Sequence, residues 1–220
     1  MRVAVLGTGM VGRTLAPAIT AAGNDVTIGT RDVAQLLESN ADFATWHREH
    51  PSVVLDSFST AAKAAELVVN ATSGAVSLDA LGLVGAANLA GKVLVDVSNP
   101  LDFSGGMPPT LTVANTDSLG EQIQRAFPDA LVVKTLNTVN ADLMVRPEAL
   151  DGGNHDAFLC GNDEQARSLV AGLLREWFGW RSVLDLGDIT AARGMEMYLP
   201  LWLRVMAAVG SAAFNVKVVQ

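Results

Sequence analysis

Several common features are scarce in this chain of 220 residues, and each absence narrows its class. The single cysteine, Cys160, excludes an internal disulfide. It lies in an apolar run beside Leu159 and Gly161, which predicts a buried strand residue rather than an activated thiol. No uninterrupted apolar run reaches the roughly 18 residues that a transmembrane helix needs, so we expect no membrane partner.

Positive charge is also scarce. The chain has 15 Lys and Arg against 23 Asp and Glu, a formal net charge of −8. A nucleic-acid surface needs a basic face, so we expect no nucleic-acid partner. The first residues lack the charged region, apolar segment and cleavage site of a secretory signal. We therefore expect a soluble cytoplasmic protein.

The sequence contains no convincing set of metal ligands. His47 and His50 lie three residues apart, but they have no cysteine or paired carboxylate nearby, and Glu49 alone does not complete a site. We expect no metal, and we interpret these histidines as part of a solvated helix face. We also find no Ser/His/Asp arrangement and no carboxylate pair that would predict acid–base or nucleophilic catalysis.

Apolar residues are abundant: 50% of the chain is hydrophobic and 17% is charged. This composition predicts a sizeable core and excludes a disordered chain. The length fits one large domain, or one domain with a small appendage.

A glycine-rich turn dominates the first 31 residues. The apolar run 3–6 precedes Gly7, Gly9 and Gly12, a helical segment follows to residue 22, and a second apolar run covers 26–28. In this strand–turn–helix context the first glycine permits a tight turn, the second admits a pyrophosphate, and the third packs helix on strand. The helix N-terminus then offers unpaired N–H groups to the phosphates. The stretch predicts a dinucleotide site.

The end of the second apolar run bears on which dinucleotide binds. A NAD site has an acidic residue about 20 positions beyond the glycines, to accept a hydrogen bond from the ribose 2′-hydroxyl. Here Thr30 and Arg31 come before Asp32, and a guanidinium can bind a 2′-phosphate. This order favours NADP. In the alternative interpretation Thr30 is a helix N-cap, Arg31 is a solvated charge and Asp32 is the ribose ligand.

Further strands alternate with helices along the chain, which predicts parallel βαβ units with right-handed crossovers. The apolar runs predict strands at 53–55, 67–70, 92–97, 131–133, 156–161 and 182–186. We therefore predict an α/β fold, a doubly wound and mostly parallel sheet with a small C-terminal helical extension. Residues 1–150 would form the dinucleotide-binding domain. Residues 151–220 would continue the sheet with a strand, a helix and a strand, followed by an apolar helix, without a clear linker.

Polar residues follow several of these strands, and ligands of open α/β sheets lie outside the carboxyl ends of the strands. Candidates for lining the cofactor pocket are therefore Thr72 and Ser73, whose alternative role is a helix N-cap. Asn99 could face the nicotinamide. Lys134 and Asn137 are the weak candidates for a catalytic role near it, unless this strand end binds nothing. The long loop 101–117 is our candidate for covering the substrate.

The segment 189–214 is apolar and helical, and Pro200 should kink or break it. Apolar residues cover more than one face, which requires burial in the core or against a second subunit. We expect a homodimer through this helix.

These motifs together resemble those of the NADPH-dependent reductases of coenzyme F420, an 8-hydroxy-5-deazaflavin, and of the bacterial dinucleotide-binding proteins of the same family. The matching segments, which span nearly the whole chain, are Val5–Gly12, Ile28–Arg31, Asp96–Pro100, Lys134–Ala141, Cys160–Asp163 and Phe214–Val218.

This resemblance implies a Rossmann domain with a small C-terminal part, usually dimeric. It implies an oxidoreductase that transfers hydride between NADP(H) and a flavin-like acceptor, a deazaflavin or a flavin. By motif position, Thr30 and Arg31 would hold the 2′-phosphate. Residues along the rest of the cofactor would be Thr8, Gly9, Met10 and Val11 at the pyrophosphate, with Thr72, Ser73 and Ala141 beyond them.

Two other functions fit the same sequence. One is a reductase of another branch, of the pyrroline-5-carboxylate or 3-hydroxy-acid type, although the roughly 70 residues after position 150 leave little room for the long helical domain of those enzymes. The other is a non-catalytic NADP sensor.

Overall fold

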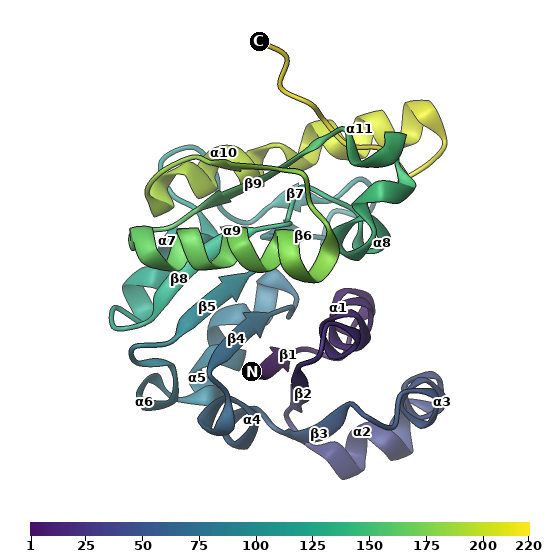
Figure 1. The fold of residues 1–220 in the computed structure, drawn as a ribbon, viewed down its shortest axis with the longest axis vertical. Helices are drawn as coiled ribbons and strands as arrows, with labels where there is room; N and C mark the ends of the chain where they lie inside the picture. The colour runs from purple at the N-terminus through teal and green to yellow at the C-terminus, as the bar shows by residue number, and fades with distance from the viewer.

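An eight-stranded sheet forms the centre of the molecule (Figure 1). The computed structural model describes residues 1–220. The sheet has the order β10-β9-β8-β5-β4-β1-β2-β3, and every neighbouring pair is parallel except β8 and β9. The strands are β1 (Arg2–Leu6), β2 (Asp25–Thr30), β3 (Val54–Ser57), β4 (Leu67–Asn70), β5 (Val93–Asp96), β8 (Leu131–Thr135), β9 (Asp156–Cys160) and β10 (Ser182–Asp185). A separate hairpin pairs β6 (Leu101–Asp102) with β7 (Thr110–Leu111). The predicted α/β fold with a mostly parallel sheet is confirmed.

Helices cover both faces of this sheet (Figure 1). The α-helices are α1 (Met10–Ala21), α2 (Val33–Ser39), α3 (Ala41–Glu49), α4 (Phe58–Ala64), α5 (Ser77–Val84), α6 (Ala86–Leu89), α7 (Leu119–Ala126), α8 (Ala141–Val145), α9 (Glu164–Phe178), α10 (Ala192–Met197) and α11 (Leu199–Val209). Short 3₁₀ turns are η1 (Gly74–Val76), η2 (Pro147–Ala149), η3 (Asp151–Gly153) and η4 (Ile189–Ala191). None of the helices combines the length and apolar character that a membrane span requires.

Successive strand residues feed two separate cores, because side chains alternate between the faces of a sheet. Val3 and Val5 of β1 pack with α1, α3, α8 and α9. Ala4 and Leu6 pack on the other face with α4, α5, α7 and α10. Burial on both faces explains why the sequences of these strands are continuous apolar runs and do not alternate between apolar and polar residues.

The strand β9 runs antiparallel to β8, with Lys134 opposite Cys160 and Thr135 opposite Leu159. A parallel pair requires a crossover that carries the chain back across the sheet. The connection 136–155 contains only α8 and two short turns, and α8 packs against α1. The chain therefore re-enters the sheet from the edge where β8 ended. Beyond it, β9 and β10 belong to the same sheet, with α9 between them in the chain.

A proline separates the last two helices. α10 ends at Met197 and Pro200 occupies the first turn of α11, where its missing N–H costs nothing. The break expected at Pro200 is therefore present. Within α11 only Leu199 is buried, while Leu201 is 58% and Val209 62% exposed. This helix lies on the surface of the single chain rather than in its core.

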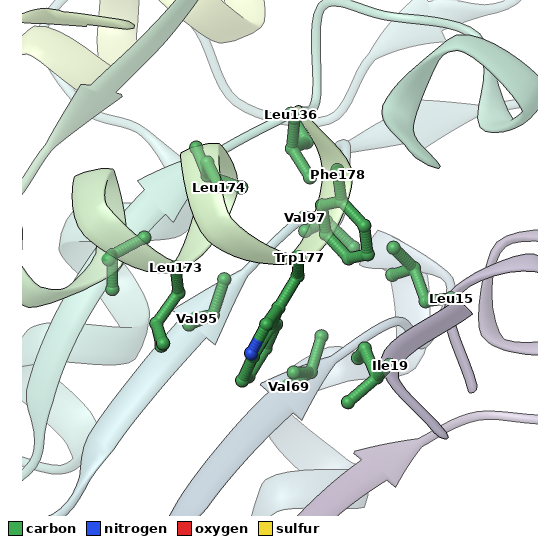
Figure 2. A pocket seen from close by; sticks show the side chains of 11 residues that line it. Leu15, Ile19, Val69, Val95, Val97, Leu136, Leu173, Leu174, Trp177 and Phe178 are labelled. Carbon is green, nitrogen blue, oxygen red and sulfur yellow. The ribbon is translucent and has the colours of Figure 1, made fainter. Parts of the chain in front are cut away.

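One small cavity of about 20 Å³ lies inside the first core, where α9 crosses the sheet (Figure 2). Leu173 and Trp177 of α9 face Val69 and Val95 of the strands across it, with Ile19 of α1 beside them (Figure 2). Every lining residue is hydrophobic. A water molecule there would find no polar partner, so the space is a packing gap and not a ligand site.

Candidate functional site

The three glycines of the first turn have the geometry that their spacing predicts. Gly7 has a φ of +118°, and a Cβ on it would lie 2.6 Å from the carbonyl oxygen of Ala71. A Cβ on Gly12 would lie 2.1 Å from the carbonyl oxygen of Gly7. A Cβ on Gly9, in contrast, meets no atom within 4 Å. Gly7 and Gly12 therefore hold backbone against backbone, while the space over Gly9 is open to a ligand.

The helix α1 begins directly after this turn. Its N-cap residue, Gly9, has no side chain that could accept hydrogen bonds from the first amides of the helix. The first amide of the helix that has a partner in the chain is that of Arg13, which donates to Gly9 O. The N–H groups of Met10, Val11 and Gly12 donate to no group of the chain. These amides and the positive end of the helix dipole form a site for a phosphate.

A cleft of about 480 Å³ extends from the glycine turn to the end of β2. Thr30 and Arg31 line its far end, and Thr72 and Ser73 line it after β4. Its remaining lining residues are Gly7, Thr8, Gly9, Gly29, Leu36, Phe58, Ala71, Val76, Asp79, Ala80 and Leu83. This cleft has the size and position of a nucleoside site at the switch point of a doubly wound sheet.

The three polar residues at the end of β2 and directly after it have different surroundings. Thr30 is buried, and the N-cap of α2 is Asp32, whose carboxylate accepts from Gln35 N at 3.0 Å. The alternative in which Thr30 caps the helix is therefore wrong. Arg31 is exposed, lines the cleft and has no ion-pair partner in the chain. Its guanidinium is free for an anion, whereas the carboxylate of Asp32 already stabilises a helix end.

A second cleft of about 160 Å³ adjoins the first, and both share Ala71, Thr72 and Ser73. Val11 and Asn99 are among its walls, and the others are Gly74, Val97, Ser98, Leu101 and Phe103. We call it the nicotinamide-side cleft, because a dinucleotide bound at the glycine turn has its second nucleotide on this side. The two clefts together follow the carboxyl ends of β1, β4 and β5.

Asn99 and Asn137 form a reciprocal pair at this edge. Asn99 Nδ2 donates to Asn137 O at 2.8 Å, and Asn137 Nδ2 donates to Asn99 Oδ1 at 2.9 Å and to Met195 O at 3.1 Å. Asn137 is buried, its Oδ1 has no partner, and it lines neither cleft. Ala141 begins α8 and also lies outside both sets of lining residues. Asn137 thus contacts Asn99, a residue of the cleft wall, and does not reach the cleft itself.

Lys134 lies in the interior and not in a cleft wall. Its side chain is fully buried, and Nζ donates to Asp96 Oδ2 at 2.7 Å and to Ser98 O at 2.6 Å, with Glu196 Oε1 at 2.9 Å. Burial disfavours the charged ammonium, but the carboxylates of Asp96 and Glu196 outweigh it and raise the pKa of Lys134. Its placement corrects the expectation that it faces the nicotinamide: it is a charged anchor beneath the site.

A buried polar network surrounds this ammonium. Asn70, Asp96 and Lys134 are aligned in register on three adjacent strands. Thr72 Oγ1 donates to Asn70 Oδ1 at 2.7 Å, and Asn70 Nδ2 donates to Asp96 Oδ1 at 2.8 Å. Ser98 Oγ also donates to Asp96 Oδ1, at 2.7 Å. The network therefore connects the loops after β4 and β5, which line the clefts, to one buried charge cluster.

Glu196 joins the C-terminal helices to this cluster. Its carboxylate accepts from the amides of Leu119 and Gly120, at 2.8 and 3.0 Å, at the start of α7. Sequence reasoning missed Asn70, Asp96 and Glu196. A signal was available for the first two, because each is a polar residue that ends a wholly buried apolar strand. Glu196 carried no such local signal.

The remaining reactive side chains are occupied or buried. Burial raises the pKa of the Cys160 thiol to about 12, so it stays protonated at neutral pH. His47 Nε2 lies 2.9 Å from Val53 O, and His50 Nδ1 lies 2.8 Å from Trp46 O. No three His, Cys, Asp or Glu side chains gather where they could hold a metal ion. The polar groups that line the clefts are amides, hydroxyls, the guanidinium of Arg31 and the carboxylate of Asp79.

The contact between Gly12 and Gly7 yields a prediction. The variant Gly12→Ala is expected to lose about 1–3 kcal/mol of unfolding free energy, because the new methyl group would overlap Gly7 O. It should also weaken NADPH binding, since the turn must shift. Urea denaturation and calorimetric titration measure both effects. The matched control Gly9→Ala adds the same methyl group in open space and should keep its stability; equal stability loss in the two variants would contradict this assignment.

Comparison with known proteins gives matches over the whole chain. Residues 2–100 match the family model described as NADP oxidoreductase, coenzyme F420-dependent. The chain is 58% identical to a protein of Arthrobacter sp. FB24 whose crystal structure is described as that of a candidate F420-dependent NADP reductase. The two chains cover each other completely, with a TM-score of 0.98.

More distant relatives match over part of their length. The chain is 31% identical over 115 residues to the F420-dependent NADP reductase of Methanocaldococcus jannaschii, covering 51% of this chain and 50% of that protein. It is 28% identical over 206 residues to the metalloreductase STEAP3 of Rattus norvegicus, covering 91% of this chain and 38% of that protein. The chain thus spans half or less of the length of these two curated relatives.

Proposed function

This chain belongs to the family of coenzyme F420-dependent NADP oxidoreductases, and we propose that it transfers hydride between NADP(H) and a flavin-like acceptor, a deazaflavin or a flavin. The observation that carries the proposal is the continuous pair of clefts across the sheet edge. An open phosphate site lies at their centre, and an unpaired guanidinium lies at one end. These are the groups that an NADP molecule requires.

The residues present fit NADP in a specific order. The amides of Met10 and Val11 would bind the pyrophosphate, and the bare backbone of Gly9 lets it approach. Arg31, with Thr30 beside it, would hold the 2′-phosphate through charge-assisted hydrogen bonds. Thr72 reaches both clefts and would contact the middle of the cofactor. When bound, NADPH supplies the hydride from its nicotinamide ring.

The protein's contribution to such a reaction is positioning. Hydride transfer between two stacked rings depends on distance and orientation, and it needs no side-chain acid or base. This matches a nicotinamide-side cleft whose lining residues carry no ionisable side chain. The buried network under Thr72 and Ser98 would keep the cleft walls fixed while the cofactor and acceptor exchange.

The test is an anaerobic assay that follows NADPH absorbance in the presence of an 8-hydroxy-5-deazaflavin, FMN or menadione. We expect NADPH to be oxidised with at least one of the two flavin-like acceptors, the deazaflavin or FMN. Tight NADPH binding with no turnover for any acceptor would contradict it and would favour the non-catalytic sensor.

We also propose that two copies associate through α11. The support is its exposed apolar surface, which includes Leu201 and Val209, on a helix that its own chain leaves uncovered. Sedimentation velocity distinguishes a dimer from a monomer of 23.0 kDa. A monomer at micromolar concentration would contradict the proposal.

A further inference from the structure

Phe103 is a large aromatic residue at the rim of the nicotinamide-side cleft. It follows β6 directly and lines the cleft, yet it is 57% exposed. Phe103 is the only exposed one of the seven phenylalanines in the chain. An exposed aromatic ring at the mouth of a cleft with both apolar and polar walls is a surface for contact with a ligand.

The backbone around Phe103 is held firmly. Asp102 Oδ1 accepts from Ser104 N at 2.8 Å, which closes a tight turn with Phe103 in the middle. Phe103 O accepts from Gly106 N at 2.9 Å. The base of the hairpin is closed by a further bond between its two ends, where Thr112 N donates to Pro100 O at 2.8 Å. The ring is therefore presented at the rim by an ordered turn, which reduces the entropy lost when a ligand binds.

The rest of this cleft sets the chemistry of what Phe103 can contact. Its apolar walls are Val11, Val97 and Leu101, and none of its lining residues is charged. On one side of the cleft the backbones of Gly74 and Asn99 are in contact, because a Cβ on Gly74 would lie 2.0 Å from the carbonyl oxygen of Asn99. Thr72 and Phe103 line the same cleft, so a molecule bound there beside a cofactor lying along Thr72 would be within reach of the Phe103 ring.

We propose that Phe103 stacks on the ring of the hydride acceptor and selects acceptors with an uncharged, flat, fused aromatic system. This inference rests on the proposed function and adds the residue that determines acceptor specificity. Phe103 contributes no proton and no electron. It holds the acceptor ring over the nicotinamide-side cleft, since offset stacking favours parallel rings at contact distance.

The test is a fluorescence titration of the NADP⁺-loaded protein with riboflavin, an uncharged fused-ring probe. The wild-type chain should quench riboflavin fluorescence saturably. Phe103→Ala should bind riboflavin about tenfold more weakly, because the stacking contact is lost. Phe103→Trp should restore the affinity, whereas Phe103→Leu should not, because it keeps apolar bulk without a ring. In turnover, Phe103→Ala should raise the KM for the acceptor more than it lowers kcat.

Met107→Ala is the matched control. Met107 lies on the same hairpin and is 71% exposed, but it does not line the cleft, so its replacement should leave riboflavin binding unchanged. NADPH affinity, measured by calorimetry, should stay within about twofold in every variant.

Three results would overturn the inference while leaving the proposed function intact. These are wild-type protein that binds NADPH but not riboflavin, Phe103→Ala that binds riboflavin as wild type does, and Phe103→Leu that restores full affinity. A loss of NADPH affinity in Phe103→Ala as large as the loss for riboflavin would instead place the ring against the cofactor. Wild-type protein that fails to bind NADPH would refute the proposed function, and this inference with it.

Discussion

Replacing Lys134 by methionine is expected to lower the free energy of unfolding by about 3–5 kcal/mol, the range found when one partner of a buried ion pair is removed. Methionine has a similar length, so the packing volume is nearly kept. The carboxylates of Asp96 and Glu196 would remain in the interior without the ammonium that faces both of them. Urea denaturation measures the change.

Two further variants make this prediction specific. Lys63→Met removes an exposed ammonium that has no ion-pair partner and should change stability by less than about 0.5 kcal/mol. Combining Lys134→Met with Asp96→Asn and Glu196→Gln removes all three charges and should recover part of the loss, since no uncompensated charge stays buried. A loss below about 1 kcal/mol in Lys134→Met would show that the cluster is not the charged anchor described above.

Replacing Arg31 by alanine is expected to weaken NADPH binding roughly 10- to 100-fold, the equivalent of about 1.5–3 kcal/mol for hydrogen bonds to a charged group. NADH lacks the 2′-phosphate, so its affinity should change by less than about twofold in the same variant. Arg31→Lys should fall in between, because lysine keeps the charge but loses the planar fork. Calorimetric titration with both cofactors measures the three affinities.

A control for general charge effects is Arg48→Ala. Arg48 is also exposed, but it lies on α3, bonds only within its own helix, and is not a cleft residue. NADPH affinity should not change in this variant. If Arg31→Ala weakened NADPH and NADH equally, the 2′-phosphate assignment would be wrong, and Asp32 would become the ribose ligand to test.

The parts of the fold that the sequence predicted are those fixed by local constraints. The spacing of the glycines predicts close backbone contacts, and the structure has them: Gly12 lies against Gly7 within the strand–turn–helix unit, and Gly7 lies against Ala71 after β4. The six inner strands are buried on both faces and need apolar runs, which made them easy to locate. The edge strands β3 and β10 contain no buried residue, and shorter apolar runs located them. The direction of β9 could not, because it depends on how α8 packs against α1 rather than on any local pattern.

The residues of the candidate site also fall into those that local sequence position predicted and those that it did not. Thr30, Arg31, Thr72, Ser73 and Asn99 line the clefts, as strand ends of an α/β sheet do. Lys134 obeys the same positional rule but turns inward, because Asp96 beside it and Glu196 from α10 compensate its charge. Glu196 is far away in the sequence, and no spacing rule connects two such residues. The sequence predicted a role for the loop 101–117 but not for Phe103 in particular, because only its exposed position at the rim of the cleft distinguishes this residue.

Hydride transfer by this chain is measured most directly with NADPH that carries deuterium at both C4 positions of the nicotinamide. The protein is mixed anaerobically with an 8-hydroxy-5-deazaflavin, and the reduced deazaflavin is analysed by mass spectrometry. We predict that one deuterium becomes bound to carbon in the reduced ring, as direct hydride transfer requires. Label that is absent from the reduced acceptor, or NADPH that binds without reducing it, would contradict hydride transfer to a deazaflavin by this chain.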